Sequence, residues 1–367
     1  MSSTKEAHFL VSARKYRPAS FDTVIGQKAV VETLSQAIKS DQLAHAYLFC
    51  GPRGVGKTSC ARIFAKEIYF KFAPEAKEED LAFHLFELDA ASNNSVDDIR
   101  QLIEQVRIQP QKGKYKIYII DEVHMLSQSA FNAFLKTLEE PPKHVIFILA
   151  TTEKHKILPT ILSRCQVFDF HRIKPEDTVA HLQYIAEKEG VKATEEALYL
   201  IAQKAEGGMR DALSLYDQMV NGCQGEITHE KAIEHLHLLD ASMYLTFTEP
   251  FLQANMTFCL NSLQQILEKG FDLHQFLLGL AEHCRNLLIA KSDQTTHLLA
   301  VAESFKKQYV EQAKSIEKDW ILLALDELSQ ADVQYKNAKN QRLLTELTLL
   351  KLCSLAEHLK KKILIRA

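Results

Sequence analysis

Residues 51–58 carry the strongest chemical signal in the sequence. They read Gly-Pro-Arg-Gly-Val-Gly-Lys-Thr and fit the G-x-x-x-x-G-K-[ST] pattern of a phosphate-binding P-loop. Glycines allow backbone N–H groups to turn inward around a phosphate, and the helix that follows adds the positive end of its dipole. Lys57 can then reach the β- and γ-phosphates, and the Thr58 hydroxyl can bind Mg²⁺. The residues predicted to hold the nucleotide here are Gly51, Pro52, Arg53, Gly54, Val55, Gly56, Lys57, Thr58 and Ser59.

The segments on either side of this pattern support a nucleotide site. Residues 46–50 form an apolar run of the right length for a buried strand, and residues 59–66 have apolar side chains at helical spacing. The alternative is an ordinary glycine-rich turn between a strand and a helix. Because the P-loop requires this strand–loop–helix context, the nucleotide-binding interpretation is favoured.

Two adjacent acids end the third predicted strand, an apolar run over residues 116–122. Asp121 would hold Mg²⁺ together with Thr58, since α/β sheets place ligands at the carboxyl ends of their strands. Glu122 would orient and deprotonate an attacking water, a role that suits a positioned carboxylate. Two acids after a strand are weak evidence alone, because surface acids are common, but they are strong evidence downstream of a P-loop.

Thr152 follows another apolar strand, predicted over residues 145–150. At the tip of a strand beside the P-loop strand, its side chain could contact the γ-phosphate or the attacking water. A simple cap on the strand end is the alternative, and the residues alone leave both open.

Residues 9–27 are predicted to form an extended arm rather than a helix, because Pro18 and the turn-forming Ser20 and Asp22 interrupt them. One interpretation is a strap over the core. The other is a lid over an adenine ring, and the P-loop favours it. The residues predicted to form this lid are Val24 and Ile25 as apolar contacts, with Tyr16, Arg17 and Pro18 beside them.

The order of the predicted elements gives the fold class. Five apolar strands separated by helices predict a mostly parallel α/β domain with a three-layer arrangement. After Pro175 no strand is predicted, and three amphipathic helices follow over residues 177–189, 195–206 and 210–220. Beyond Pro250 there is no further proline, and leucines recur at helical spacing, which predicts an all-helical region. The predicted domains are 1–173 (α/β), 174–240 (three-helix) and 241–367 (all-helical).

Composition places few limits on function but excludes some classes. The 367 residues are 46% hydrophobic and 25% charged, as in an ordinary soluble protein. The net charge of −3 argues against a wholly basic nucleic-acid coat and leaves a local basic patch open. The seven cysteines are scattered without a C-x-x-C pair, which indicates reduced thiols. The polar N-terminus and the lack of a run of ~18 apolar residues predict a cytoplasmic protein that neither carries a signal peptide nor spans a membrane.

The assembled motifs resemble a known family. The P-loop, Asp121-Glu122, Thr152, Ser163-Arg164-Cys165 and Gly208-Met209-Arg210-Asp211 together resemble AAA+ ATPases of the clamp-loader group. Residues 14–18, 87–92, 118–126 and 138–142 narrow the resemblance to the gamma/tau subunits of bacterial DNA polymerase III. The resemblance covers the whole chain and is densest over residues 10–220.

The resemblance implies a P-loop ATPase domain, a small helical lid and an all-α collar. It implies ATP hydrolysis with Mg²⁺ that opens a sliding clamp and places it on primed DNA, within a five-membered assembly held together by the collar. Contact with the polymerase core would be indirect. Thr152 corresponds to a first sensor, Arg210 to a second sensor that touches the γ-phosphate from the lid, and Arg164 to the finger that completes a neighbour's site. The implied catalytic set is Lys57, Asp121, Glu122, Thr152, Arg164 and Arg210.

One departure from the family concerns zinc. Many members carry four cysteines that hold a structural zinc just after the P-loop helix, whereas residues 67–88 contain no cysteine here. No zinc is therefore expected.

The helix start at Asn93-Asn94-Ser95 suits DNA backbone phosphates, although simple capping of the helix explains these residues equally well.

Two other functions are weighed against an ATPase motor. A stator-like, structural clamp-loader subunit typically loses P-loop or acidic residues, and Lys57, Thr58, Asp121 and Glu122 are all present. Another AAA+ DNA motor, such as a branch-migration helicase, would usually end in a winged-helix domain. The leucine-rich, proline-free C-terminal region argues against that.

Overall fold

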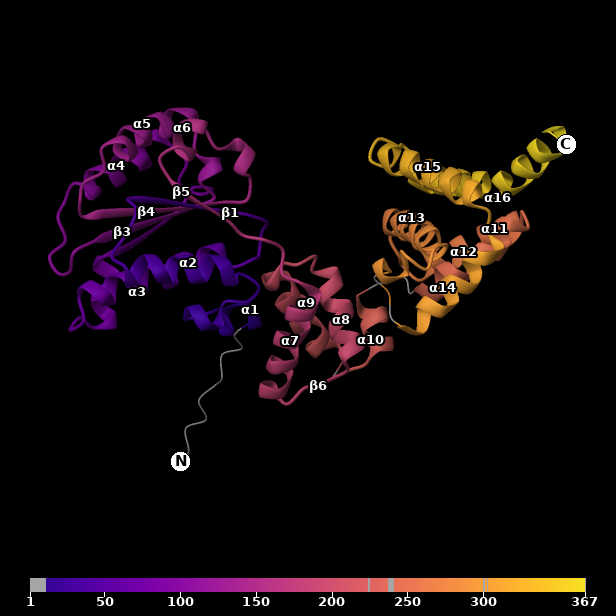
Figure 1. Cartoon of the computed structure of the whole chain (residues 1–367), viewed down its shortest axis with the longest axis horizontal. Helices are drawn as coiled ribbons and strands as arrows, with labels where there is room; N and C mark the ends of the chain where they lie inside the picture. Colours follow the sequence, from indigo (N-terminus) through magenta and orange to yellow (C-terminus); the bar gives the residue numbers. More distant parts are fainter. Residues whose placement is uncertain (1–10, 224, 237–240, 300, 302, 367) are drawn as a thin grey trace. The chain divides into compact units, whose positions relative to one another are not determined.

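A five-stranded parallel sheet organises the N-terminal part of the molecule, in the strand order β2-β3-β4-β1-β5 (Figure 1). The computed structural model describes residues 11–223, 225–236, 241–299, 301 and 303–366. The strands are β1 (Ala46–Cys50), β2 (Leu85–Asp89), β3 (Lys116–Asp121), β4 (Val145–Thr151) and β5 (Gln166–Asp169). All five were predicted, and the fold class of a parallel α/β P-loop domain is confirmed. The P-loop strand β1 lies between β4 and β5, so Cys50 pairs with Thr151 and the ends of both strands lie side by side.

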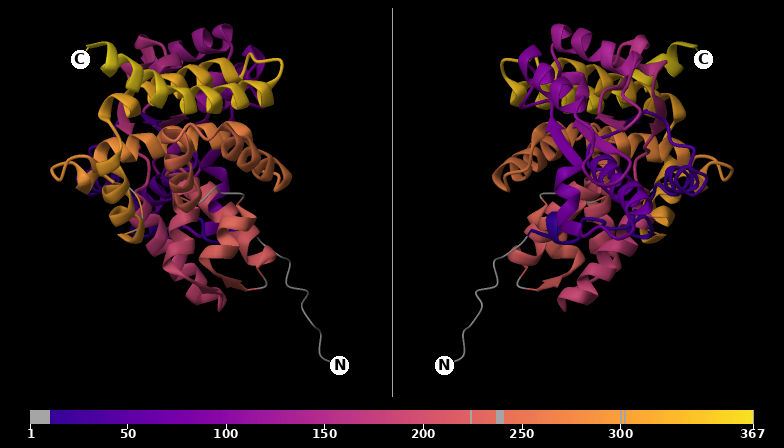
Figure 2. Two further views of the ribbon diagram at one scale, coloured as in Figure 1. Left: turned by 90° about the vertical axis from the view of Figure 1, so that its right-hand side faces the viewer. Right: turned by 90° about the vertical axis from the view of Figure 1, so that its left-hand side faces the viewer.

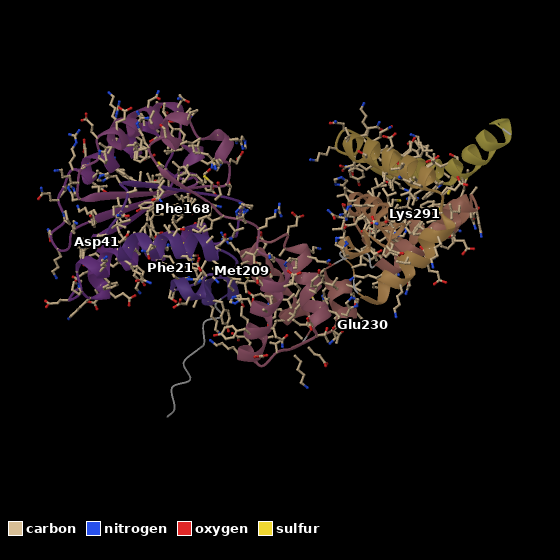
Figure 3. All side chains as sticks on the ribbon, in the orientation of Figure 1. Phe21, Asp41, Phe168, Met209, Glu230 and Lys291 are labelled. Carbon is tan, nitrogen blue, oxygen red and sulfur yellow. The ribbon has the colours of Figure 1, made fainter. Side chains whose placement is uncertain are left out.

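Alternating side chains of the strands build a core on each face of the sheet. On β1, Tyr47 and Phe49 face one way, and Leu48 faces the other. Helices α2 (Lys28–Lys39) and α3 (Lys57–Phe72) cover the first face, and α4 (Val96–Val106), α5 (Gln128–Glu139) and α6 (Pro159–Leu162) cover the second (Figure 1). Phe168 of β5, labelled in Figure 3, extends the first core, with its ring centroid 5.7 Å from that of Phe49. The short helices η2 (Glu78–Phe83), η3 (Val123–Met125) and η4 (Lys154–Lys156) lie in connections.

The N-terminal arm is not fully extended, so that prediction is wrong in part. It contains α1 (Ser12–Lys15) and the 3₁₀ turn η1 (Phe21–Thr23). Pro18 disfavours a helical conformation at the residue before it, so the helical turn ends at Tyr16, and a short turn upstream remains allowed. Residues 9 and 10 of the predicted arm lie outside the described residues.

The three helices predicted after Pro175 are present as α7 (Pro175–Glu189), α8 (Glu195–Lys204) and α9 (Met209–Gly222), followed by α10 (His229–His235). The prediction that strands stop at Pro175 is wrong. A two-stranded sheet joins β6 (Lys192–Ala193) and β7 (Glu226–Ile227), and the Thr194 N–H donates to the Ile227 carbonyl at 3.0 Å. Strands of two residues are too short to produce a hydrophobic alternation, and only their pairing defines them.

The chain divides into two compact units, Met1–Ala232 and Ile233–Ala367. The α/β domain and the lid helices α7–α9 lie in the first. Every described element of the second from α11 onward is helical: α11 (Ala241–Leu252), α12 (Met256–Glu268), α13 (Leu273–Ala290), η5 (Thr296–Leu298), α14 (Glu303–Ser315), α15 (Lys318–Tyr335) and α16 (Gln341–Arg366). Helices α15 and α16 pack against each other (Figure 2), and Phe247, Phe276 and Trp320 are buried in the common core. The predicted boundaries at 173 and 240 remain predictions.

Gly279 of α13 gives a test of packing in the second unit. A Cβ at this position would lie 2.0 Å from the Tyr244 hydroxyl oxygen. Gly→Ala inside a helix normally stabilises by roughly 0.5–1 kcal/mol, but this clash reverses the sign. We expect Gly279→Ala to lower the free energy of unfolding by about 1–3 kcal/mol, the usual cost of overpacking.

Denaturant unfolding followed by tryptophan fluorescence measures this effect, because the chain has one tryptophan and Trp320 is buried in the second unit. The matched control is the double variant Gly279→Ala with Tyr244→Leu. Relative to Tyr244→Leu alone, the alanine should lower the free energy of unfolding by less, because the clashing ring is absent. An alanine variant as stable as the parent would contradict the packing described here.

Candidate nucleotide-binding site

The P-loop connects β1 to α3 through backbone conformations that require glycine. At Gly51, with φ of 150°, a Cβ would lie 2.4 Å from the Phe170 carbonyl oxygen. Gly56 adopts the left-handed conformation, with φ of 99°, immediately before α3 begins at Lys57. The loop therefore turns tightly around the N-terminus of α3, where unpaired N–H groups and the helix dipole attract anions.

Lys57 is 6% exposed, and its side chain folds back onto the first residues of the loop. Its ammonium group donates to the carbonyl oxygens of Gly51 at 2.8 Å and Pro52 at 2.7 Å. Burial lowers the pKa of Lys57, and the nearby carboxylates of Glu122 and Asp121 oppose this change. The lysine is thus placed at the phosphate end of the site, close to both predicted acids.

Thr58 and Asp121 meet directly, as their predicted joint role requires. The Thr58 hydroxyl donates to Asp121 Oδ2 at 2.6 Å, and Asp121 Oδ1 accepts from the Glu122 N–H at 3.0 Å. A hydroxyl and one carboxylate are the protein ligands that Mg²⁺ commonly uses beside phosphate oxygens and water, so the donor set fits this ion. Among the described residues, no group of three or more His, Cys, Asp and Glu side chains could hold a metal ion by itself. The expectation of no zinc still rests on the absence of cysteine from residues 67–88.

Glu122 is held by Thr152. Glu122 has a left-handed backbone, with φ of 47°, which is uncommon for a residue with a side chain and occurs most often at functional sites. Its Oε2 atom accepts from the Thr152 N–H at 3.2 Å and from the Thr152 hydroxyl at 3.0 Å. The contact of Thr152 with the γ-phosphate or the attacking water stays a prediction; the partner that the structure describes is the Glu122 carboxylate.

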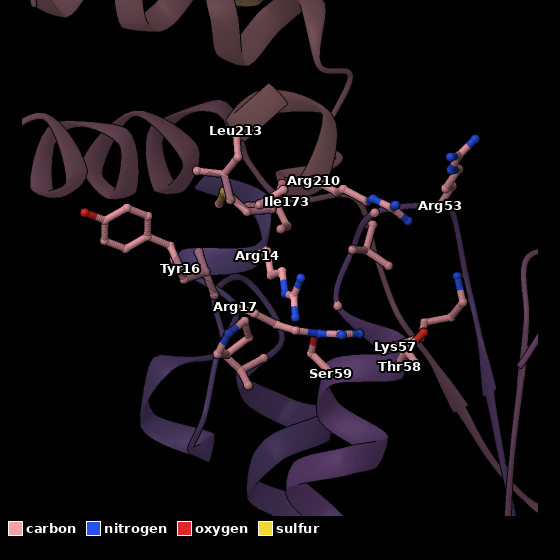
Figure 4. Close-up of a pocket in the computed structure, with 18 of the residues that line it drawn as sticks. Arg14, Tyr16, Arg17, Arg53, Lys57, Thr58, Ser59, Ile173, Arg210 and Leu213 are labelled. Atoms are coloured by element: carbon pink, nitrogen blue, oxygen red, sulfur yellow. The ribbon is translucent and has the colours of Figure 1, made fainter. Parts of the chain in front are cut away.

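A cavity of about 490 Å³ joins the arm, the P-loop and the lid helices, and its size suits a small-molecule ligand (Figure 4). The predicted residues that line it are Tyr16, Arg17, Pro18, Val24, Ile25, Arg53, Gly54, Val55, Gly56, Lys57, Thr58, Ser59, Asp121, Glu122 and Arg210. Gly51, Pro52, Thr152 and Arg164 do not line it. Ile173, Leu213 and the imidazole of His181 also line it, and sequence patterns did not identify them. Met209, from the motif at residues 208–211, lines it as well.

Cations converge on one part of this cavity. Arg17 Nε donates to the Ser59 hydroxyl at 3.0 Å, on the first turn of α3. Figure 4 shows Arg14 and Arg210 entering from the arm and from α9. Burial lowers the pKa of Arg17, and the positive charges of Arg62 and Arg210 add to this effect, while Glu87 and Asp121 oppose it. With Lys57, this arrangement suits a polyphosphate, whereas the Arg53 guanidinium points away from the other cations in Figure 4. Arg17 contacts the first turn of α3, so it lies nearer to the P-loop than a lid over the adenine implies.

Hydrogen bonds join the lid helices to the P-loop and to the N-terminal arm. The Arg210 N–H donates to the Gly54 carbonyl at 3.4 Å, so α9 begins against the P-loop. The arm binds the opposite end of the lid, where the Ser12 N–H donates to Asp217 Oδ2 at 2.7 Å and Tyr16 hydrogen-bonds Glu189. A ligand in the cavity therefore contacts segments that bridge the α/β domain and the lid.

Arg164 lies outside the cavity, two residues after the end of α6. Its guanidinium pairs with Glu139 at 2.9 Å and donates to the Thr160 carbonyl at 2.7 Å. The side chain is 34% exposed. A surface ion pair and a finger for a neighbouring subunit both remain compatible with this position.

Comparison with known proteins identifies the class and then the family. Family models match residues 26–174 (DNA polymerase III, delta subunit), 177–225 (DNA polymerase III clamp loader subunit, ATPase lid domain) and 227–367 (DNA polymerase III subunits gamma and tau, domain III). The solved structure of a point variant of Thermotoga maritima RuvB is similar in fold, with a TM-score of 0.50 and 18% identity over 65% of this chain and 80% of that one. The molecule is thus an AAA+ ATPase-type protein of the clamp-loader class.

The DNA polymerase III subunit gamma of Buchnera aphidicola is 32% identical over 358 residues, which cover 95% of this chain and 99% of that protein. The tau subunits of Bacillus subtilis and Escherichia coli are 38% and 35% identical, over 93% and 95% of this chain. The chain belongs to the DNA polymerase III gamma/tau family. It spans 62% and 56% of the lengths of those two tau subunits. In the described part of the chain, no helix is long and apolar enough to cross a membrane.

Proposed function

We propose that this chain is an ATP-hydrolysing motor subunit of a clamp loader, acting in the cytoplasm to place a sliding clamp on primed DNA. The main support is the joint position of the P-loop, the Thr58–Asp121 pair and Glu122 at one cavity lined by cations. Its partners would be the other subunits of a five-membered assembly, the clamp and the DNA backbone, with the polymerase core reached indirectly. The three domains would be an ATPase core (1–173), a lid (174–240) and a collar (241–367).

In this proposal each side chain has a separate task. Lys57 and Arg210 would bind the β- and γ-phosphates, and Thr58 and Asp121 would hold Mg²⁺, which neutralises charge on the phosphates. Glu122, with its Oε2 fixed by Thr152, would accept the proton of the attacking water. The apolar side chains of Val24, Ile25, Ile173, Met209 and Leu213 would enclose the base.

The stator-like alternative predicts nucleotide binding without turnover. The intact pairing of Thr58 with Asp121 favours a motor, because a binding-only subunit has no need of a metal-holding acid and a water-activating base. The likeness to RuvB concerns the fold and does not favour a branch-migration motor.

The deciding experiment is steady-state ATP hydrolysis by the full chain in its clamp-loader assembly, with and without a sliding clamp and primed DNA. We expect turnover that rises when both are present. ATP binding without turnover under every condition would favour the stator-like function, and stimulation by branched DNA but not by clamp and primed DNA would favour a different motor.

A further inference from the structure

His124 lies two residues after Glu122, in the 3₁₀ turn η3 that follows β3. Its side chain is 5% exposed, so the imidazole is buried at the edge of the proposed active site. Neither the P-loop pattern nor the proposed catalytic set includes it. A buried imidazole needs polar partners, because its ring nitrogens lose their hydrogen bonds to water.

Both ring nitrogens have oxygen partners from the ends of neighbouring strands. Nδ1 lies 3.0 Å from the Thr151 hydroxyl and 3.4 Å from Glu122 Oε2. Nε2 lies 3.2 Å from Glu153 Oε1. A carboxylate can only accept, so a hydrogen bond to Glu153 or to Glu122 requires a hydrogen on the ring nitrogen that faces it. The imidazole therefore fills the space between two carboxylates, one of which is the proposed general base.

The opposite carboxylate is itself fixed. Glu153 pairs with Lys156 at 2.9 Å, and its N–H donates to the Thr151 hydroxyl at 3.0 Å. His155 also lies 3.4 Å from Glu153. The far side of His124 thus rests on the start of the connection from β4 to α6, and this anchoring limits how far the ring can move.

On the near side, the contacts described for the Glu122 carboxylate all involve Oε2: the N–H and hydroxyl of Thr152, and His124 Nδ1. This leaves Oε1 as the oxygen that can turn toward a water. A general base must be held within a fraction of an ångström of its productive position. Glutamate has a long side chain, and without His124 its carboxylate would be held by Thr152 through Oε2 alone.

We propose that His124 is a positioning residue that fixes the Glu122 carboxylate against Thr152, with Glu153 as its anchor. The Nδ1 edge of the imidazole, 3.4 Å from Glu122 Oε2, holds the carboxylate against Thr152 and leaves Oε1 to face the water. His124 does not touch the reacting atoms, so removing it should affect turnover and leave ATP binding unchanged. This inference rests on the proposed role of Glu122 as the base.

Three substitutions test it in the full chain within its assembly, by single-turnover hydrolysis and by fluorescent-ATP titration. His124→Phe keeps the ring and removes both nitrogens, and we expect turnover to fall about 10²-fold, as for a misplacement of ~1 Å. His124→Asn places an amide near the Nδ1 position and should retain most of the activity. His124→Gln places its amide near Nε2, beside Glu153, and should resemble His124→Phe.

The Asn and Gln variants are matched in polarity, so their comparison decides the question even if the phenylalanine variant fails to fold. Equal turnover of these two variants would overturn the proposal. So would a loss of ATP affinity that accounts for the fall in turnover, because that result indicates a structural defect of the pocket.

A double variant separates positioning from general damage. In a Glu122→Gln background, His124→Phe should cause no further loss, since the group that it positions is already disabled. An undiminished further loss would contradict the inference. Parental turnover of Glu122→Gln alone would overturn the proposed base, whereas parental turnover of His124→Phe beside an inactive Glu122→Gln would overturn only the role of His124.

Discussion

Glu122→Gln will bind ATP with parental affinity and hydrolyse it roughly 10²–10⁴-fold more slowly, the usual contribution of a positioned general base. Glutamine keeps the size of the side chain and an oxygen that can accept from the Thr152 N–H and hydroxyl, so the local structure should persist. The amide cannot take a proton from water. Single-turnover hydrolysis gives the rate, and calorimetric titration gives the affinity.

Two control variants separate the role of the Glu122 carboxylate from that of a neighbouring carboxylate and from nucleotide binding. Glu153→Gln changes the carboxylate that anchors His124 and does not line the cavity, so it should reduce turnover less than Glu122→Gln, which removes the base itself. Lys57→Ala should lose nucleotide binding, because it removes the positive charge that binds the phosphates. Because Lys57 also bridges Gly51 and Pro52, thermal unfolding must confirm that the alanine variant is folded. Parental hydrolysis by Glu122→Gln would show that another group activates the water.

The three inner strands β1, β3 and β4 could be predicted from the sequence because they are continuous apolar runs. β1 and β4 are buried along their whole length, and an unbroken apolar run is what burial on both faces requires. The pairing of β6 with β7 could not be predicted, since two-residue strands are defined only by a distant partner in the sequence. The turn of α1 was missed because its four residues depend on packing against α9 and not on a periodic pattern.

The candidate site likewise contains residues that the sequence predicts and residues that only the fold reveals. Thr58, Asp121 and Glu122 were found because each belongs to a local pattern with a fixed position at a strand end or helix start. His124 and His181 reach the site or its edge only through the fold, and a single histidine in a sequence carries no such signal. Arg210 was suggested by the family resemblance alone, and its place in the cavity follows from the contact between α9 and Gly54.

Arg164→Ala will reduce ATP turnover in the assembly by about 10³–10⁵-fold, the usual contribution of an arginine supplied from outside the site. Arg164 does not line the cavity of its own chain, whose cations are Arg14, Arg17, Arg53, Lys57 and Arg210. A partly exposed arginine at a chain's surface can instead reach a neighbour's γ-phosphate. ATP affinity should change little, because the charge that Arg164 stabilises develops only as the phosphoryl group transfers.

The competing interpretation is that Arg164 serves only its ion pair with Glu139, and such surface pairs contribute about 0–1 kcal/mol to stability. Glu139→Gln is the matched control, because it breaks the same pair and leaves the arginine in place. A finger predicts that Glu139→Gln retains turnover while Arg164→Ala loses it. Equal effects of the two variants would assign Arg164 to the ion pair.

A mixing experiment tests whether the site is shared between chains. Lys57→Ala chains lack a working P-loop, and Arg164→Ala chains lack the finger, so each preparation alone should be inactive. In a mixed assembly, some interfaces pair the intact P-loop of an Arg164→Ala chain with the intact Arg164 of a Lys57→Ala chain. Those interfaces should hydrolyse ATP, because a site needs one functional copy of each group and not two from the same chain. If mixing restores no turnover although both chains are present in the assembly, Arg164 acts within its own chain, and the proposal of a shared site is wrong.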